Sequence, residues 1–224
     1  MRITMLAFPD MTQLDLTGPH EVLAQVPGAT VTVVARERAP VAARGGLRIV
    51  PDATLADAPA ADLLFVPGGP GTGALLEDGP VLEFLRAQAA QARWITSVCT
   101  GALVLGAAGL LVGRRATTHW LSMPLLTEFG ATPVAQRVVI DGDRITGGGV
   151  TAGIDFGLAV AAQIAGEDTA RRIQLLLEYD PAPPFDAGHP DRAPAAVVDG
   201  VRSAMAPLQA ARRDAARRAA QRYC

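Results

Sequence analysis

Short apolar runs alternate with helical patterns through the first 180 residues, and this order constrains the fold more than any other feature. Strands are predicted over residues 3–8, 30–35, 63–66 and 94–98, and hairpins over residues 41–50 and 138–146. Helices are predicted from Gly18-Pro19 to Gln25, and over residues 81–92, 100–108, 151–165 and 169–177. Strands that alternate with helices indicate a mostly parallel sheet covered on both faces. The prediction is therefore a three-layer α/β/α sandwich.

The composition changes beyond residue 180. Residues 180–194 contain five prolines, which predicts an extended loop or linker. Residues 197–223 are rich in alanine and arginine, which favours a helix with a thin apolar face. The chain is thus divided into a domain of residues 1–180 and a C-terminal segment of residues 181–224. The final helix is expected either to be solvated or to pack on the body or on a partner subunit.

Charge and composition narrow the function classes. The net charge of −2 offers no basic field for nucleic acid or an anionic membrane. All 20 basic residues are arginine, which excludes lysine chemistry and, with the heavy use of alanine, suggests a GC-rich bacterial genome. The N-terminal apolar run is too short for a signal peptide, and no apolar stretch reaches the roughly 20 residues that span a bilayer. A soluble cytoplasmic protein is expected.

The segment Trp94–Ala102 carries the strongest indication of chemistry. An apolar run ends on Cys99, and a helical pattern of small residues begins at once, as in a strand-to-helix nucleophile elbow. A helix N-terminus favours a thiolate, and cysteine pKa values fall to about 3.5–7.5 in such sites. The alternative is a buried, inert cysteine. The other cysteine, Cys224, is the last residue, so neither a disulfide framework nor a metal cluster is expected.

Asp15 follows the first predicted strand and is the candidate acid. Ligands of a parallel sheet gather outside the carboxyl ends of its strands, so Asp15 would meet Cys99 if their strands are neighbours. The alternative is a carboxylate that caps the helix or complements its dipole.

Backbone groups can complete the site. The Pro67–Gly71 turn ends the third core strand, and its Gly69 N–H can pair with the Thr100 N–H as an oxyanion-type hole, unless the turn is only tight. The Thr100 hydroxyl can hold substrate or water, or cap the helix. The glycine run that includes Gly148 leads a strand into a helix and can form an active-site wall or a tight crossover.

His119 is the central histidine of the chain. A cysteine–histidine pair is an ordinary way to activate a thiol. A histidine beside Trp120 in a packed segment is also often a core residue, and the sequence does not decide between the two.

Together these segments resemble the DJ-1/PfpI superfamily from about residue 2 to residue 178. The segments that carry the resemblance are residues 15–19, 67–69, 98–101, 115–120 and 149–155. The resemblance implies a flavodoxin-like fold, a homodimer and no cofactor or metal. It is strongest to the members that hydrate isonitriles, since Thr100 replaces the histidine of the protease-like members and Asp15 replaces the glutamate of many DJ-1-like members.

This resemblance implies that Cys99 attacks the isonitrile carbon, with Asp15 as general acid and base. Backbone N–H groups of Gly69, Thr100 and Val150 would hold the thiolate or the developing charge. His119 and Gly148 are candidates for the pocket. Isonitrile and water would be the small-molecule partners, with no nucleic acid and no membrane.

Other activities stay open at this point. One is a glyoxalase- or deglycase-like reaction on small aldehydes, and another is a ligand or redox sensor in which Cys99 oxidises. Transcription regulators also carry the domain ahead of a DNA-binding module. The roughly 45 residues after the matched region are too few for such a module.

Overall fold

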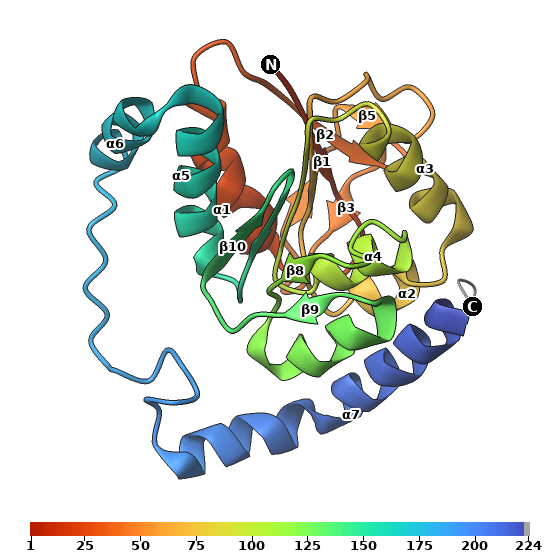
Figure 1. Cartoon of the computed structure of the whole chain (residues 1–224), viewed down its shortest axis with the longest axis vertical. Coiled ribbons are helices and arrows are strands. Elements are labelled where there is room, and N and C mark those ends of the chain that lie inside the picture. The colour runs from red at the N-terminus through yellow and green to blue at the C-terminus, as the bar shows by residue number, and fades with distance from the viewer. Residues whose placement is uncertain (222–224) are drawn as a thin grey trace.

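A mostly parallel sheet forms the centre of the computed structural model, which describes residues 1–221. Its seven strands run in the order β10-β11-β7-β6-β1-β2-β5 (Figure 1). They are β1 Arg2–Leu6, β2 Thr30–Ala35, β5 Ala53–Thr54, β6 Leu63–Val66, β7 Trp94–Val98, β10 Val138–Asp141 and β11 Arg144–Gly147. Every pairing is parallel except that of β10 with β11, an antiparallel hairpin. Central strand β6 is completely buried, as its continuous apolar sequence predicts.

Helices cover both faces of this sheet. Figure 1 shows α1 and α5 on one face, and α3 and α4 on the other. These helices are α1 Gln13–Ala24, α3 Gly79–Ala89, α4 Gly101–Ala107 and α5 Ala152–Ala165. The predicted three-layer α/β sandwich is therefore confirmed, and its architecture is flavodoxin-like.

Short elements decorate the sandwich. They are the hairpin of β3 Val41–Ala42 with β4 Arg48–Ile49, the pair β8 Arg115–Ala116 with β9 Thr132–Pro133, helix α2 Thr72–Leu75, helix α6 Glu167–Leu176 and the 3₁₀ helix η1 Trp120–Phe129. The first hairpin turns at Gly45-Gly46, as predicted. The 3₁₀ helix was not predicted from the sequence.

Helix α1 begins earlier than the sequence predicts. It starts at Gln13, so Pro19 lies inside the helix instead of at its first position. The reason is close packing against α5. A Cβ added to Gly153 would lie 3.0 Å from the Pro19 ring, and one added to Gly157 would lie 2.9 Å from Val22. The two helices approach where glycine leaves room, and this contact outweighs the cost of an interior proline.

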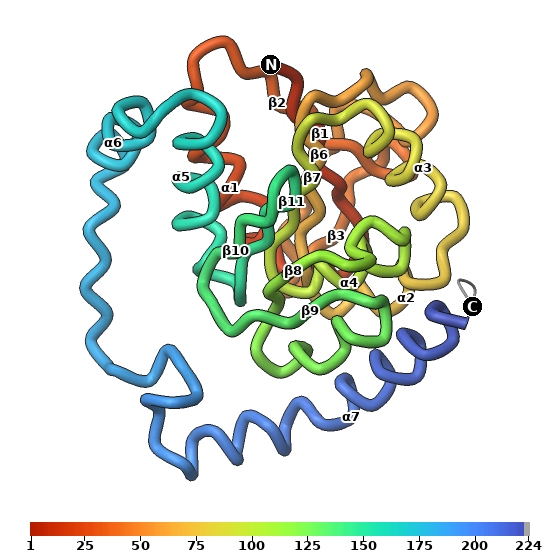
Figure 2. Tube along the Cα trace, viewed as in Figure 1, coloured from red at the N-terminus to blue at the C-terminus, as the bar shows by residue number. Residues whose placement is uncertain are grey.

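The C-terminal segment wraps around the body. After α6, residues 177–194 run as an extended segment alongside the molecule, which we call the strap. The chain then forms the long helix α7, Ala195–Ala220 (Figure 2). Helix α7 crosses the end of the sheet where the parallel strands finish, and it contacts η1, α2 and α4. Its alanine face is buried at Ala215, Ala216 and Ala219, so the helix is packed on the body and is not freely solvated. Cys224 and the last residues of the predicted helix lie outside the described residues.

Candidate functional site

Cys99 occupies a strained turn between β7 and α4. Its φ is 55°, in the left-handed region that non-glycine residues rarely adopt. Two carbonyls hold this conformation, because the Cys99 N–H lies 3.0 Å from the Gly147 oxygen and 2.8 Å from the Gly148 oxygen. The Thr118 hydroxyl donates to the Cys99 carbonyl at 2.7 Å. This is the predicted nucleophile elbow, and its backbone is fixed on both sides.

The turn after β6 brings Asp15 to Cys99. The Gly68 N–H donates to Asp15 Oδ2 at 3.0 Å, while Asp15 Oδ1 has no hydrogen-bond partner among the described residues. A Cβ added to Gly68 would lie 2.8 Å from both Asp15 Oδ2 and the Cys99 Cβ, and 2.5 Å from the Thr100 nitrogen. Only glycine fits here, so the carboxyl and the thiol face each other across a backbone without a side chain.

Asp15 and Cys99 lie close together although their strands are not neighbours, which differs from the condition set in the sequence analysis. Strand β6 lies between β1 and β7. The loop after β1 crosses the end of β6, where the Thr12 N–H donates to the Gly68 carbonyl at 2.9 Å. That crossing carries the first turn of α1 over to the cysteine.

Burial sets the proton affinities of both groups. Asp15 is fully buried, and desolvation raises its pKa to about 7, with the interaction with Cys99 and the hydrogen bond from Gly68 opposing the rise. Desolvation and then the Asp15 carboxylate raise the pKa of the Cys99 thiol, while N–H groups of Thr100 and Val150 oppose that rise. The expectation of a low-pKa thiol is therefore wrong for this resting site. The thiol keeps its proton, and Asp15 is the group that ionises near neutrality.

Thr100 shapes the turn and does not cap α4. Its Oγ1 accepts from the Gly69 N–H at 3.0 Å and lies 3.2 Å from the Thr72 hydroxyl, and it makes no capping hydrogen bond. The Gly69 and Thr100 amides were expected to form one oxyanion-type hole, but in the structure they have different partners. The Thr100 N–H lowers the pKa of the Cys99 thiol, whereas the Gly69 N–H is occupied by the Thr100 side chain. The amide of Val150 takes the second place on the sulfur instead of Gly69.

His119 lines a cavity beside the site. Its Nδ1 accepts from the Leu121 N–H at 3.3 Å, which places the proton of the neutral ring on Nε2. Desolvation and the charge of Arg212 lower the pKa of His119 to about 4, so the ring is neutral at working pH. The ring packs against Gly149, since a Cβ added there would lie 3.0 Å from His119 Cδ2. No hydrogen bond joins His119 to Cys99 within residues 1–221.

The cavity beside the site has a volume of about 410 Å³. Its lining comes from residues 117–120 and 123, 135–137, 148–152, and 188–190 and 192. Gly148 belongs to this wall, as expected, and Val150 connects the wall to the Cys99 sulfur. The strap contributes His189 and Arg192, so residues beyond the sandwich help to enclose the cavity.

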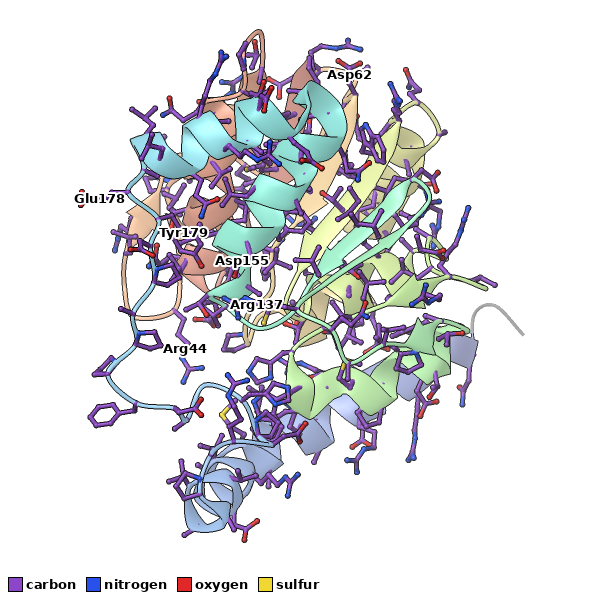
Figure 3. All side chains as sticks on the ribbon, turned by 60° about the vertical axis from the view of Figure 1, so that its left-hand side comes forward. Arg44, Asp62, Arg137, Asp155, Glu178 and Tyr179 are labelled. Carbon is purple, nitrogen blue, oxygen red and sulfur yellow. The ribbon has the colours of Figure 1, made fainter. Side chains whose placement is uncertain are left out.

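A polar cluster ties the strap to the rim of this cavity. Arg137 forms an ion pair with Asp155, and the Tyr179 hydroxyl donates to Asp155 Oδ1 at 3.2 Å. Figure 3 shows these three labelled residues together beside α5. Asp155 thus anchors the cavity wall and the start of the strap.

Sequence reasoning missed Arg212, the charged residue of α7 that reaches the site. The side chain is 4% exposed, and its Nη2 donates to the Gly69 carbonyl at 3.0 Å. The available indication was its spacing, because Arg212 lies on the same helical face as Ala215, Ala216 and Ala219.

The described residues contain no cluster of three or more histidine, cysteine, aspartate or glutamate side chains that could hold a metal ion. None of the helices within residues 1–221 has both the length and the apolar character needed to cross a membrane.

Known proteins are similar to this chain in sequence and in structure. The chain is 54% identical to the isonitrile hydratase of Pseudomonas putida over 98% of this chain and 96% of that protein. It is 30% identical to a glutathione-independent glyoxalase of Caenorhabditis elegans over 74% of this chain and 89% of that protein. The crystal structure of a ThiJ/PfpI family protein from Pseudomonas syringae superposes with a TM-score of 0.94 at 45% identity, covering 96% of this chain and 90% of that one.

The sequence pattern of the DJ-1/PfpI family matches residues 1–163, a span that holds the elbow, Asp15 and the Gly68 turn. The chain belongs to the DJ-1/PfpI family.

Proposed function

We propose that this protein is a hydro-lyase that hydrates an isonitrile, R–NC, to the N-substituted formamide. The supporting observation is the buried Asp15 carboxyl set against the Cys99 thiol, in a chain 54% identical to an isonitrile hydratase over nearly its full length. Because this pair holds one mobile proton near neutral pH, it can supply the nucleophile and the acid–base group together.

In the first half-reaction, ionised Asp15 takes the proton of the Cys99 thiol while the sulfur attacks the terminal carbon of the isonitrile. Protonated Asp15 then delivers that proton to the same carbon, which leaves a thioimidate, R–N=CH–S–Cys99. Amide groups of Thr100 and Val150 stabilise the sulfur while it carries negative charge.

In the second half-reaction, the again ionised Asp15 removes a proton from water, and the resulting hydroxide adds to the thioimidate carbon. The nitrogen takes that proton from Asp15, the carbon–sulfur bond breaks as Asp15 moves the hydroxyl proton of the intermediate to the sulfur, and the thiol of Cys99 is restored. The balance is one isonitrile plus one water to one formamide. The unpartnered Oδ1 of Asp15 is the oxygen available for these transfers.

The cavity of about 410 Å³, which is lined by Thr118 and Val150 but by neither Cys99 nor Asp15, would take the R group. The wall of the cavity combines the rings of His119 and Trp120 with Gly148 and Gly149. It therefore suits an apolar R group and offers polar contacts at its rim.

The experiment is turnover of a panel of alkyl isonitriles and methylglyoxal, with formamide and lactate as the measured products. We expect formamide, and we expect Cys99→Ser to abolish it because a hydroxyl beside a weak base is a poor nucleophile. Lactate without formamide would support the glyoxalase alternative, which rests on the 30% identical glyoxalase. No product from either substrate, with Cys99 oxidised by peroxide, would support a redox sensor.

We also propose that the working form is a homodimer in the bacterial cytoplasm. The segment from α6 to α7 exposes several large apolar side chains that a second copy of the chain could cover. They are Leu175, Leu176, Phe185, Val197 and Val201. A free thiol as nucleophile also suits a reducing compartment. We retain the division into a catalytic unit of residues 1–180 and an appended segment of residues 181–224 as part of this proposal.

A further inference from the structure

Arg212 is a buried cation without a carboxylate partner in the part of the chain that the structure describes. Its Nη2 donates to the Gly69 carbonyl and its Nη1 lies 3.2 Å from the Ser122 hydroxyl, while its Nε has no partner. Burial lowers the pKa of this guanidinium. A charge removed from water at such cost needs an anion or a strong dipole nearby.

Other arginines of α7 behave differently. Arg217 and Arg218 are exposed and pair with Glu128 at 3.6 Å and Glu77 at 2.8 Å. Both pairs join α7 to the body at its surface. Arg212 alone of these three points inward, toward the site, and its two hydrogen bonds are to neutral oxygens.

The carbonyl that Arg212 holds belongs to the turn that builds the site. Gly69 accepts from Arg212 through its oxygen and donates through its nitrogen to Thr100, and the preceding amide, of Gly68, orients Asp15. The Thr72 hydroxyl also donates to the Gly69 oxygen, at 2.8 Å. A guanidinium on this carbonyl therefore fixes the turn whose Gly68 amide orients Asp15 and whose Gly69 amide is bound by Thr100.

We propose that Arg212 is a positioning residue that also serves as the counter-ion of the Cys99–Asp15 pair. It orients the Gly68-Gly69 turn, and its charge interacts with Cys99, so that it stabilises the sulfur while the pair carries its negative charge there. The segment after the matched family region thus completes the electrostatics of the site. This inference rests on the proposed roles of Cys99 and Asp15 and not on the identity of the substrate.

The titration of the pair involves few other charged groups. Asp15 enters from α1, Arg212 from α7, and His119 from the start of η1. His119 is neutral above about pH 4, and the turn before α5 presents the backbone of Val150 to the sulfur. A shift in the titration of the pair after a change at Arg212 would therefore report the lost charge.

The test measures the pH dependence of iodoacetamide labelling, quantified on the peptide that carries Cys99. Arg212→Met removes the charge and keeps the length of the side chain, while Arg212→Lys keeps the charge. Arg213→Met is the matched control, because Arg213 is the adjacent, exposed arginine of the same helix. Labelling requires no substrate, so it remains informative even if isonitrile turnover fails.

We expect Arg212→Met to raise the labelling midpoint by about one pH unit, the lower end of the range for loss of a nearby opposite charge. We expect kcat/KM for isonitrile to fall about tenfold. Arg212→Lys should keep the midpoint within a few tenths of a unit, and Arg213→Met should match the unmodified protein.

A folded Arg212→Met protein with an unchanged midpoint would overturn the proposal. If that variant does not fold, Arg212→Gln, which keeps an amide donor for the Gly69 carbonyl, replaces it under the same criterion. Failure of both neutral variants to fold, beside a folded Arg212→Lys, would also overturn it, since the charge would then serve the packing of α7 alone.

Discussion

At the scale of single residues, the chemistry depends on where one proton resides. Burial raises the pKa of Asp15 to about 7 and also raises that of the Cys99 thiol, so the two groups titrate as a pair. Above pH 7 the carboxylate is ionised beside a protonated thiol. That state is the reactive one in the proposed mechanism, because Asp15 must accept the thiol proton.

The pH dependence of turnover follows from this arrangement. We expect kcat/KM for isonitrile to rise with pH through an apparent pKa near 7, because the active form carries ionised Asp15. The measurement is a pH–rate profile from about pH 5 to pH 9 under conditions where the protein stays folded. A flat profile across this window would contradict the assignment of Asp15 as the base.

Replacement of Asp15 separates catalysis from stability. Asp15→Asn should lower kcat/KM by about two orders of magnitude, the usual worth of a general acid–base group. The same substitution should increase the stability of the fold at pH 8. The folded pKa of Asp15 lies above its unfolded value, so ionisation destabilises the fold as pH rises from about 4 through 7.

Thermal unfolding measures that second effect. We expect the Asn variant to have a higher Tm than the unmodified protein at pH 8, by at least about 2 °C, and an equal Tm near pH 4. A lower Tm at pH 8 with normal turnover would show that Asp15 serves the helix and not the reaction.

At the scale of elements, the turn after β6 determines the site. It links three elements, because its amides bind Asp15 of α1 and Thr100 before α4 and its carbonyl binds Arg212 of α7. Glycine is required at position 68 because a side chain there would enter the space between the acid and the thiol.

A single methyl group tests this requirement. Gly68→Ala should reduce kcat/KM by at least about 100-fold, since small displacements of reacting groups cost that much. Gly73→Ala is the matched control, because a Cβ at Gly73 would meet nothing within 4 Å. Circular dichroism and the Tm would show whether each variant is folded. Near-normal turnover by a folded Gly68→Ala protein would contradict the role of this turn.

At the scale of the whole molecule, the C-terminal segment determines how the site is enclosed. Residues of the strap form part of the cavity wall, and α7 covers the end of the sheet at which Cys99 lies (Figure 2). The same segment leaves Phe185 79% exposed and Leu175 82% exposed. These side chains are expected to contact a second copy, with the interface reaching toward the cysteine end of the sheet.

Assembly is measurable by light scattering at micromolar concentration. We expect about twice the 23.2 kDa chain mass, and a lower mass for the double variant Phe185→Glu and Val201→Glu. Val112→Glu, at a 63% exposed position outside the C-terminal segment, should leave the mass unchanged. A mass of one chain for the unmodified protein, with full activity, would rule out a required dimer.

The sequence by itself determined the layers, the central strands and the position of the elbow, although β1 is Arg2–Leu6 where residues 3–8 were predicted and edge strand β5 was not predicted. Local patterns specify these features, since apolar runs form buried strands and a small-residue helix follows Cys99 directly. Even Asp15 was identified, because it follows a strand at the end of a parallel sheet where ligands gather.

Only the tertiary structure decided which groups touch and where their protons lie. The sequence gives no sign that β6 separates the strands of Asp15 and Cys99, that the Gly69 amide is taken by Thr100, or that Arg212 is buried under α7. The thiol pKa was mispredicted for the same reason. A helix N-terminus is visible in the sequence, whereas the desolvation and the neighbouring carboxylate that outweigh it arise from contacts between distant segments.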